Sequence, residues 1–351
     1  MAPTSNATLV YSEIPTEAPV AGRHLKRVVD DSFDPDTVPL NGGFLVKTKG
    51  SLMDISATTK ALSLDPYMRG KMRDPSKKSY TPAFELNKPL TTLGVGEVYR
   101  SEHPSVQAGQ IFKGGMQLAE WAVVPPAAVQ FGRVVENPEG LPFSTLIGAC
   151  GMPGATAWVG LYDIGQAKKG ETIFVSAASG AVGQIVGQLA KRDGLKVIGS
   201  AGSDDKVEFL KELGFDIAFN YKKQSTLDVL KDNGVDIFFD NVGGETLDAV
   251  LATINNKGRI IACGSISQYN VPEEKRYGLK NTMNVVTKSL RWEGFIVSNH
   301  DQTAFNETMP KLVKSGEIKT KEHITKGIDN GEAFVDMLDG RNFGKALISL
   351  E

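Results

Sequence analysis

The chain has 351 residues, of which 41% are hydrophobic and 23% charged, and its net charge is −2 from 39 basic and 41 acidic side chains. This length favours about two domains, each long enough to form a developed core. The balanced charge argues against a basic nucleic-acid surface and against a polybasic membrane-binding helix.

The cysteines and the first residues bear on the compartment. Two cysteines, Cys150 and Cys263, are too few for a disulfide framework and favour a reducing environment. The opening MAPTSNATLVYSEIP has no charged segment followed by an apolar run, so we expect no signal peptide. No window approaches the roughly 18 apolar residues of a membrane span. We therefore expect a cytoplasmic protein.

Residues 1–140 are rich in glycine and proline and contain short β-like runs, such as GFLVKTKGSLM (43–53) and EWAVVPPAAVQF (120–131). Apolar runs separated by turn residues predict a twisted, barrel-like β domain. Residues 315–351 add a helical segment (331–340) and a final strand (345–351), and we expect them to complete this first domain.

Strands and helices alternate in residues 141–314. The predicted strands are 171–177, 195–201, 215–220, 235–244 and 258–264. The predicted helices between them are 181–192, 203–214, 225–234 and 245–254. This alternation is typical of a Rossmann-like, doubly wound parallel sheet, so the predicted fold class is α/β with an additional β-rich domain.

The segment FVSAASGAVG (174–183) lies between the first strand and the first helix of this region. Gly180 and Gly183 occupy the second and third positions of a dinucleotide-binding glycine motif, and Ala178 stands in the first. Small residues also serve mere helix–sheet packing. Because the motif heads a βαβ series, we predict instead that it binds a cofactor pyrophosphate.

The residues after the second strand indicate which nucleotide binds. An NAD site needs an acidic residue there, but this chain has Ser200, Ala201 and Gly202. Lys206 falls in the first helical turn, where the helix dipole disfavours a cation, and a 2′-phosphate would explain it. Tyr221 could be a second donor. NADPH is therefore predicted, although Lys206 could be a solvated lysine and Tyr221 a packed edge residue.

The histidines show no metal-binding pattern, since His24, His103, His300 and His323 are scattered and the cysteines lie far apart in sequence. We predict that no metal is bound. Tyr269 follows the last predicted strand of the alternating region, at the sheet edge where open α/β folds carry their chemistry. Its hydroxyl is a candidate donor to a developing oxyanion, and packing of the loop is the alternative role.

These features together resemble the zinc-independent branch of the medium-chain dehydrogenase/reductase superfamily, and within it the prostaglandin reductase, leukotriene hydroxydehydrogenase and alkenal double-bond reductase group. The resemblance covers most of the chain. Its segments are DPYMRGKM (65–72), MPGATAW (152–158), AASGAVGQIVGQLAK (177–191), AGSDDKVEFLKELGFD (201–216), FNYK (219–222), FDNVGGE (239–245), CGSISQYN (263–270) and RNFGK (341–345).

The resemblance implies a split GroES-like catalytic domain (1–140 with 315–351) and a Rossmann NADPH-binding domain (141–314). It implies a homodimer whose sheet is extended by the strand near residues 290–298, and a substrate pocket walled by Tyr67 and Tyr269. The cofactor-binding residues that it implies are Ser179, Gly180, Ala181, Val182, Gly183, Lys206, Tyr221, Asn241, Cys263, Gly264, Ser265, Ile266, Ser267, Tyr269, Phe295, Ile296, Val297 and Asn342.

The implied reaction is NADPH-dependent reduction of the carbon–carbon double bond of α,β-unsaturated aldehydes and ketones. Hydride goes to the β-carbon, and Tyr269 holds the resulting enolate oxygen. A quinone reductase and a non-catalytic NADPH-binding protein are the alternatives. Trp158 stands where tyrosine is commoner in the family, and it would narrow the pocket if it reached the cleft.

Overall fold

The computed structural model describes residues 4–48, 61–137 and 139–350, and the chain divides into two units. The first contains residues 1–148, 323–342 and 346–351, and the second residues 149–322 and 343–345. The part of the predicted run 43–53 that follows residue 48 lies outside the described residues. The separate roles of the two units, catalytic and cofactor-binding, stay a prediction.

The first unit is built mainly from β-strands. A three-stranded sheet has the order β2-β1-β5, from β1 (Asn6–Tyr11), β2 (Leu25–Asp30) and β5 (Lys88–Pro89). A larger curled sheet contains β3 (Phe44–Lys47), β4 (Ala61–Ser63), β6 (Thr91–Ser101), β7 (Ile111–Gln117), β8 (Trp121–Val124), β9 (Gly132–Val134), β16 (Glu322–Lys326) and β17 (Lys345–Ser349). Residues 126–131, predicted as β, form a 3₁₀ helix that begins at prolines.

Short helices complete the first unit: α1 (Met68–Lys71), α2 (Phe143–Ile147) and α11 (Glu332–Leu338). Its core joins both ends of the chain, because Phe334 and Ile348 are buried with Tyr11 and Phe112 in one apolar cluster. The predicted contribution of the last residues to the first domain therefore has a physical basis, since their apolar side chains are buried there.

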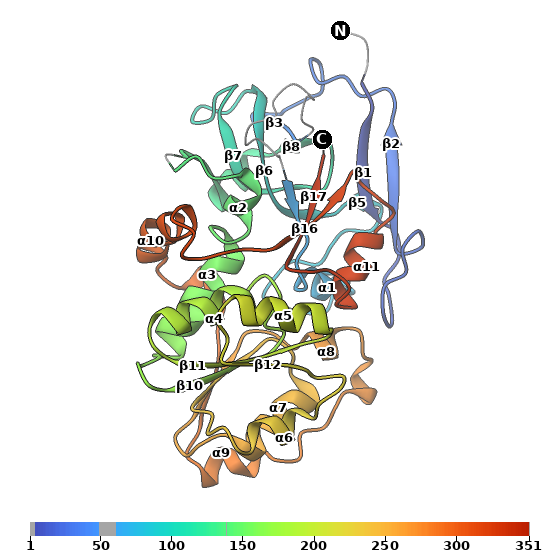
Figure 1. Cartoon of the computed structure of the whole chain (residues 1–351). Coiled ribbons are helices and arrows are strands. Elements are labelled where there is room, and N and C mark those ends of the chain that lie inside the picture. The colour runs from blue at the N-terminus through green and yellow to red at the C-terminus, as the bar shows by residue number, and fades with distance from the viewer. Residues whose placement is uncertain (1–3, 49–60, 138, 351) are drawn as a thin grey trace. The chain divides into compact units, whose positions relative to one another are not determined.

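The second unit contains a six-stranded parallel sheet of order β12-β11-β10-β13-β14-β15. Its strands are β10 (Thr172–Val175), β11 (Lys196–Ala201), β12 (Ile217–Asn220), β13 (Ile237–Asp240), β14 (Arg259–Ala262) and β15 (Arg291–Gly294). Its helices are α3 (Met152–Val159), α4 (Gly183–Arg192), α5 (Asp204–Glu212), α6 (Thr226–Leu230), α7 (Gly244–Thr253), α8 (Ile266–Tyr269), α9 (Met283–Thr287) and α10 (Thr303–Lys314). Figure 1 shows α4 and α5 on one face of the sheet and α6 and α7 on the other.

This strand order is that of the doubly wound dinucleotide-binding fold, and the predicted fold class is confirmed. The order reverses between β10 and β13, which is where such folds bind their ligands. Gly194, at φ +81°, follows α4 as predicted. Among the described residues, no helix is both long and apolar enough to cross a bilayer.

Phe215, which follows α5, locks α4 onto β11. Its buried ring occupies the space that side chains on Gly187 of α4 and Gly199 of β11 would fill. A Cβ on Gly187 would lie 1.9 Å from the Phe215 ring, and a Cβ on Gly199 would lie 2.6 Å from it. The two glycines therefore let helix and strand close around one aromatic side chain.

Candidate functional site

The glycine loop joins β10 to α4. Gly183 has no room for a side chain, because a Cβ would lie 2.6 Å from the Ala177 carbonyl oxygen. Ala178, the departure from the glycine motif, is fully buried, and its methyl group lies where a Cβ on Gly199 would come within 2.9 Å. Because Gly199 on the neighbouring strand β11 has no side chain, there is room for the Ala178 methyl group, and the loop accommodates an alanine where the motif has a glycine.

The start of α4 has the donors that an anion needs. Among the described residues, no hydrogen bond from the backbone N–H groups of Val182 and Gly183 to a protein acceptor is found. Unpartnered N–H groups at a helix N-terminus, with the positive end of the helix dipole, fit a pyrophosphate. Gly180 in this loop pairs with Gly344 in a single β-bridge, and Ser179 beside it is buried.

Lys206 lies in the first turn of α5, and its side chain is mostly buried. Burial lowers the pKa of Lys206, the Asp205 carboxylate opposes this, and the charge of Lys222 lowers the pKa further. Ser203 occupies the N-cap position, but its hydroxyl donates to Asp205 and not to the helix. Tyr221, half exposed, donates its N–H to Ala201 at the end of β11 (3.1 Å).

The ends of β10, β13 and β14 are tied together. Asn241 donates its N–H to the Ser176 hydroxyl (2.9 Å) and its side-chain amide to the Ser176 carbonyl (2.8 Å). Asp240 is buried, and its main-chain oxygen accepts from the N–H groups of Cys263 (3.0 Å) and Gly264 (2.9 Å). Burial and the nearby Asp240 raise the pKa of the Cys263 thiol to about 12, so it stays protonated at neutral pH.

Tyr269 ends the one-turn helix α8. Its hydroxyl oxygen accepts from the Ser265 N–H at 3.2 Å, so the ring folds back over its own loop. Ile266 and Ser267 donate to the main chain of 241–242 (3.2 and 2.7 Å), which fixes this loop to the end of β13. Tyr269 is half-buried, and its hydroxyl oxygen is the acceptor in this hydrogen bond.

Phe295, Ile296 and Val297 directly follow β15. Because β15 is parallel to β14, they leave the sheet at the carboxyl ends of its strands. The Phe295 ring lies against Gly160, where a Cβ would come within 3.1 Å of it. Ile296 is more than a third exposed. Asn342 belongs to the first unit and precedes Phe343 and Gly344 of the second.

Tyr67 lies in the first unit, directly before α1, where its half-buried ring packs on the apolar core. Burial raises the pKa of Tyr67 well above its usual range, and the nearby Asp65 and Tyr80 add to this. Its hydroxyl is therefore neutral at physiological pH. The remaining predicted site residues, Asn342 excepted, belong to the second unit.

Trp158 on α3 packs edge-on against Tyr162 (4.7 Å between ring centroids) and Phe305 of α10 (6.3 Å). Sequence alone did not indicate this helix–helix packing. Among the described residues, no group of three or more His, Cys, Asp or Glu side chains is arranged to hold a metal ion.

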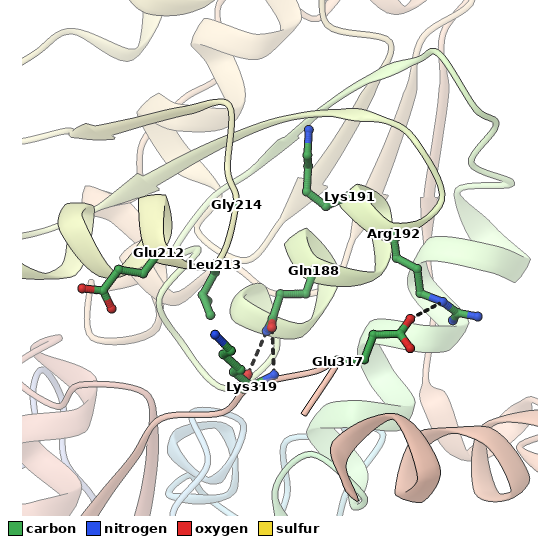
Figure 2. A pocket seen from close by; sticks show the side chains of 8 residues that line it. All are labelled: Gln188, Lys191, Arg192, Glu212, Leu213, Gly214, Glu317 and Lys319. Carbon is green, nitrogen blue, oxygen red and sulfur yellow. Dashed lines mark hydrogen bonds and ion pairs between the residues drawn. The ribbon is translucent and has the colours of Figure 1, made fainter. Parts of the chain in front are cut away.

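Two glutamines that sequence reasoning missed lie on the buried side of α4, one helical turn apart. The side-chain amide of Gln184 donates to the carbonyl oxygen of Lys321 and accepts from its N–H. The side-chain amide of Gln188 makes the same two hydrogen bonds with Lys319. The available signal was an i,i+4 pair of amides inside an otherwise apolar helix. Figure 2 shows a pocket that Gln188 lines together with Lys191 and Arg192 from the last turns of α4. No residue of the glycine loop lines it.

Comparisons with known proteins match both parts of the chain. Residues 45–131 match a model described as the N-terminal domain of oxidoreductase, and residues 181–314 one described as zinc-binding dehydrogenase. An NADP-dependent oxidoreductase of Cochliobolus heterostrophus is 44% identical over 82% of this chain and 85% of its own. An NADP(+)-dependent 2-alkenal reductase of Nicotiana tabacum is 41% identical over 84% and 87%.

A solved structure is similar over nearly the whole chain. CurA of Vibrio vulnificus, in complex with NADPH, has a TM-score of 0.83 and 32% identity and covers 98% of this chain and 99% of its own.

Proposed function

The chain belongs to the zinc-independent branch of the medium-chain dehydrogenase/reductase family, and from that membership we propose that it reduces the carbon–carbon double bond of α,β-unsaturated aldehydes and ketones. The chain is an NADP-dependent oxidoreductase. NADPH is the cofactor, as in the CurA complex. The name of the tobacco relative, an NADP(+)-dependent 2-alkenal reductase, supports the proposed reduction of a carbon–carbon double bond.

The second unit fits this cofactor. The Val182 and Gly183 N–H groups at the start of α4 would bind the pyrophosphate, and Lys206 and Tyr221 would contact the 2′-phosphate. Asn241, the 263–269 loop, residues 295–297 and Asn342 would line the remaining channel. When bound, NADPH supplies the hydride.

Tyr269 carries the proposed mechanism. Its hydroxyl would donate to the substrate carbonyl oxygen as negative charge develops there. The Ser265 N–H that its oxygen accepts polarises the phenol and makes it a stronger donor. Preorganised donors aimed at a developing oxyanion are worth several kcal/mol in a dry site. The α-carbon would then take a proton from solvent.

We also propose Tyr67 as a substrate-binding residue. Because burial keeps its hydroxyl neutral, it would offer a flat aromatic surface and one hydrogen-bonding group without a charge. This combination suits a conjugated carbonyl, which is planar and carries a single polar atom.

We also propose a homodimer formed through β15. This strand is an edge of the parallel sheet, and such edges pair with other chains unless they are protected. Trp292 on this strand is 40% exposed, and Met283 and Val286 of α9, which precedes it in sequence, are 68% and 73% exposed. Exposed apolar side chains on an edge strand and in the helix that precedes it favour pairing with a second copy.

The test is NADPH consumption with a panel that pairs each enal or enone with its saturated analogue and adds one quinone. Consumption limited to the conjugated alkenes, with the saturated carbonyl as product, supports the proposal. Consumption with the quinone alone favours a quinone reductase. Tight NADPH binding without any turnover would favour a non-catalytic role.

A further inference from the structure

Lys222, to which sequence analysis assigned only a place in a motif, lies directly after Tyr221 beyond β12. A Cβ built on Gly202 would lie 3.2 Å from the Tyr221 hydroxyl oxygen and 3.5 Å from Lys222 Cε. Both side chains therefore fold over Gly202, the residue that follows β11. The absence of a side chain at Gly202 gives them this space.

Lys206 approaches the same place from the first turn of α5. Lys222 is close enough for its charge to lower the pKa of Lys206, in addition to the larger effect of burial and against the opposing effect of Asp205. Two ammonium groups gathered near a helix N-terminus repel one another and the helix dipole. An anion between them would remove both penalties.

The nearby carboxylates do not neutralise Lys222. Asp204 accepts from Asn220 Nδ2 (2.8 Å) and from Lys223 Nζ, and Asp205 accepts from the Ser203 hydroxyl. Among the described residues, Lys223 has this ion pair with Asp204, whereas no carboxylate lies within ion-pair distance of Lys222. Two adjacent lysines thus have different surroundings.

We propose that Lys222 is a second cation for the 2′-phosphate of NADPH, beside Lys206 and with the Tyr221 hydroxyl as a further donor. A phosphate monoester carries about 1.5 to 2 negative charges at neutral pH, which a single lysine does not balance. Lys222 supplies the second charge. The proposal rests on NADPH as the cofactor and not on the reaction that the protein catalyses.

The experiment is calorimetric titration of the full chain with 2′,5′-ADP and with 5′-AMP, which differ by the 2′-phosphate alone. We expect Lys222→Gln to weaken 2′,5′-ADP binding about 5- to 20-fold, the size of one partly exposed charge-assisted contact, and to leave 5′-AMP unchanged. The affinity for 2′,5′-ADP should also fall less steeply with salt than in the wild type. Lys222→Arg should retain most of the affinity.

Lys223→Gln is the matched control, because it removes an equal charge from the next residue. We expect it to change neither affinity by more than about twofold. Equal losses from the two variants would mean a diffuse surface potential and would overturn the proposal. An unchanged 2′,5′-ADP affinity in Lys222→Gln would also overturn it. Neither result depends on enone turnover, so failure of the proposed reaction would leave this test intact.

Discussion

Gln188 holds the backbone of Lys319 at both ends: its amide nitrogen donates to the Lys319 carbonyl and its amide oxygen accepts the Lys319 N–H, each at 2.8 Å (Figure 2). Gln184 binds Lys321 in the same way, at 3.2 and 2.8 Å. The helix that begins at the glycine loop thus takes the place of a partner strand for residues 319–321.

The first prediction concerns the clamp, the four hydrogen bonds from Gln184 and Gln188 to the backbone of Lys321 and Lys319. Gln188→Met keeps the side-chain volume but removes both hydrogen bonds to Lys319, so the free energy of unfolding should fall by about 1–3 kcal/mol. Urea denaturation measures this change, and hydrogen exchange at the Lys319 N–H should accelerate. Gln224→Met, on the surface of the same unit, is the control and should be nearly neutral. Equal stability of the two variants would contradict a structural role for the clamp.

The sequence predicted the second unit well because helix and strand periodicities are local. Each predicted element of 171–264 corresponds to an observed one, with ends shifted by a few residues. The clamp could not be predicted, because Gln188 and Lys319 are 131 positions apart in sequence and Gln184 and Lys321 are 137 positions apart. The direction of Trp158 was equally hidden, because its contact with Phe305 depends on how two distant helices pack.

For the proposed site, the sequence indicated the residue types but not their surroundings. Lys206 stands out in sequence as a cation at a helix start, whereas the proximity of Lys222 appears only when β11 and β12 lie side by side. The sequence did not show why the glycine motif tolerates Ala178. The structure does, because Gly199 on another strand leaves room for the alanine methyl group. Sequence patterns report spacing along one element and not the fit between two.

The second prediction tests the catalytic assignment. Tyr269→Phe should lower turnover with an enone roughly 10- to 1000-fold, because one oxyanion donor is lost. Steady-state kinetics give kcat, and NADPH affinity should change little. Tyr277→Phe is the matched control, since its hydroxyl bonds Asp248 (3.1 Å) outside the proposed site. Full activity of the Tyr269 variant would exclude the role.

The third prediction concerns cofactor choice. Lys206→Ala should raise the KM for NADPH far more than the KM for NADH, because NADH lacks the 2′-phosphate. Lys211→Ala, on the same helix, removes a lysine that pairs with Glu208 (2.7 Å) and should leave both constants near the wild-type values. Equal effects of Lys206→Ala on the two cofactors would reject the phosphate contact.

The fourth prediction follows from Asp240. Burial raises the pKa of its carboxyl to about 6, against the Val242 and Gly243 N–H groups that favour the charged form. Between about pH 4 and 6 the folded state then holds a proton that the unfolded state has lost, so stability falls as pH rises through this window. The contribution lost is about 3 kcal/mol.

Asp240→Asn keeps an acceptor for both N–H groups and cannot ionise, so its unfolding free energy should lack this fall. Urea denaturation at pH 4, 5, 6 and 7 compares it with the wild type. Asp228→Asn, an exposed residue paired with Lys231, is the control and should not remove the fall. Parallel pH profiles for the wild type and Asp240→Asn would refute the prediction.

The position of Phe215 has a consequence for how the chain is made. The first βαβ segment, residues 172–201, packs around this ring, which lies outside the segment and follows the whole of α5 in sequence. A fragment that ends at residue 214 would lack the ring that fills the space left by Gly187 and Gly199. We therefore expect the first βαβ segment to reach its native packing only in chains that extend beyond α5.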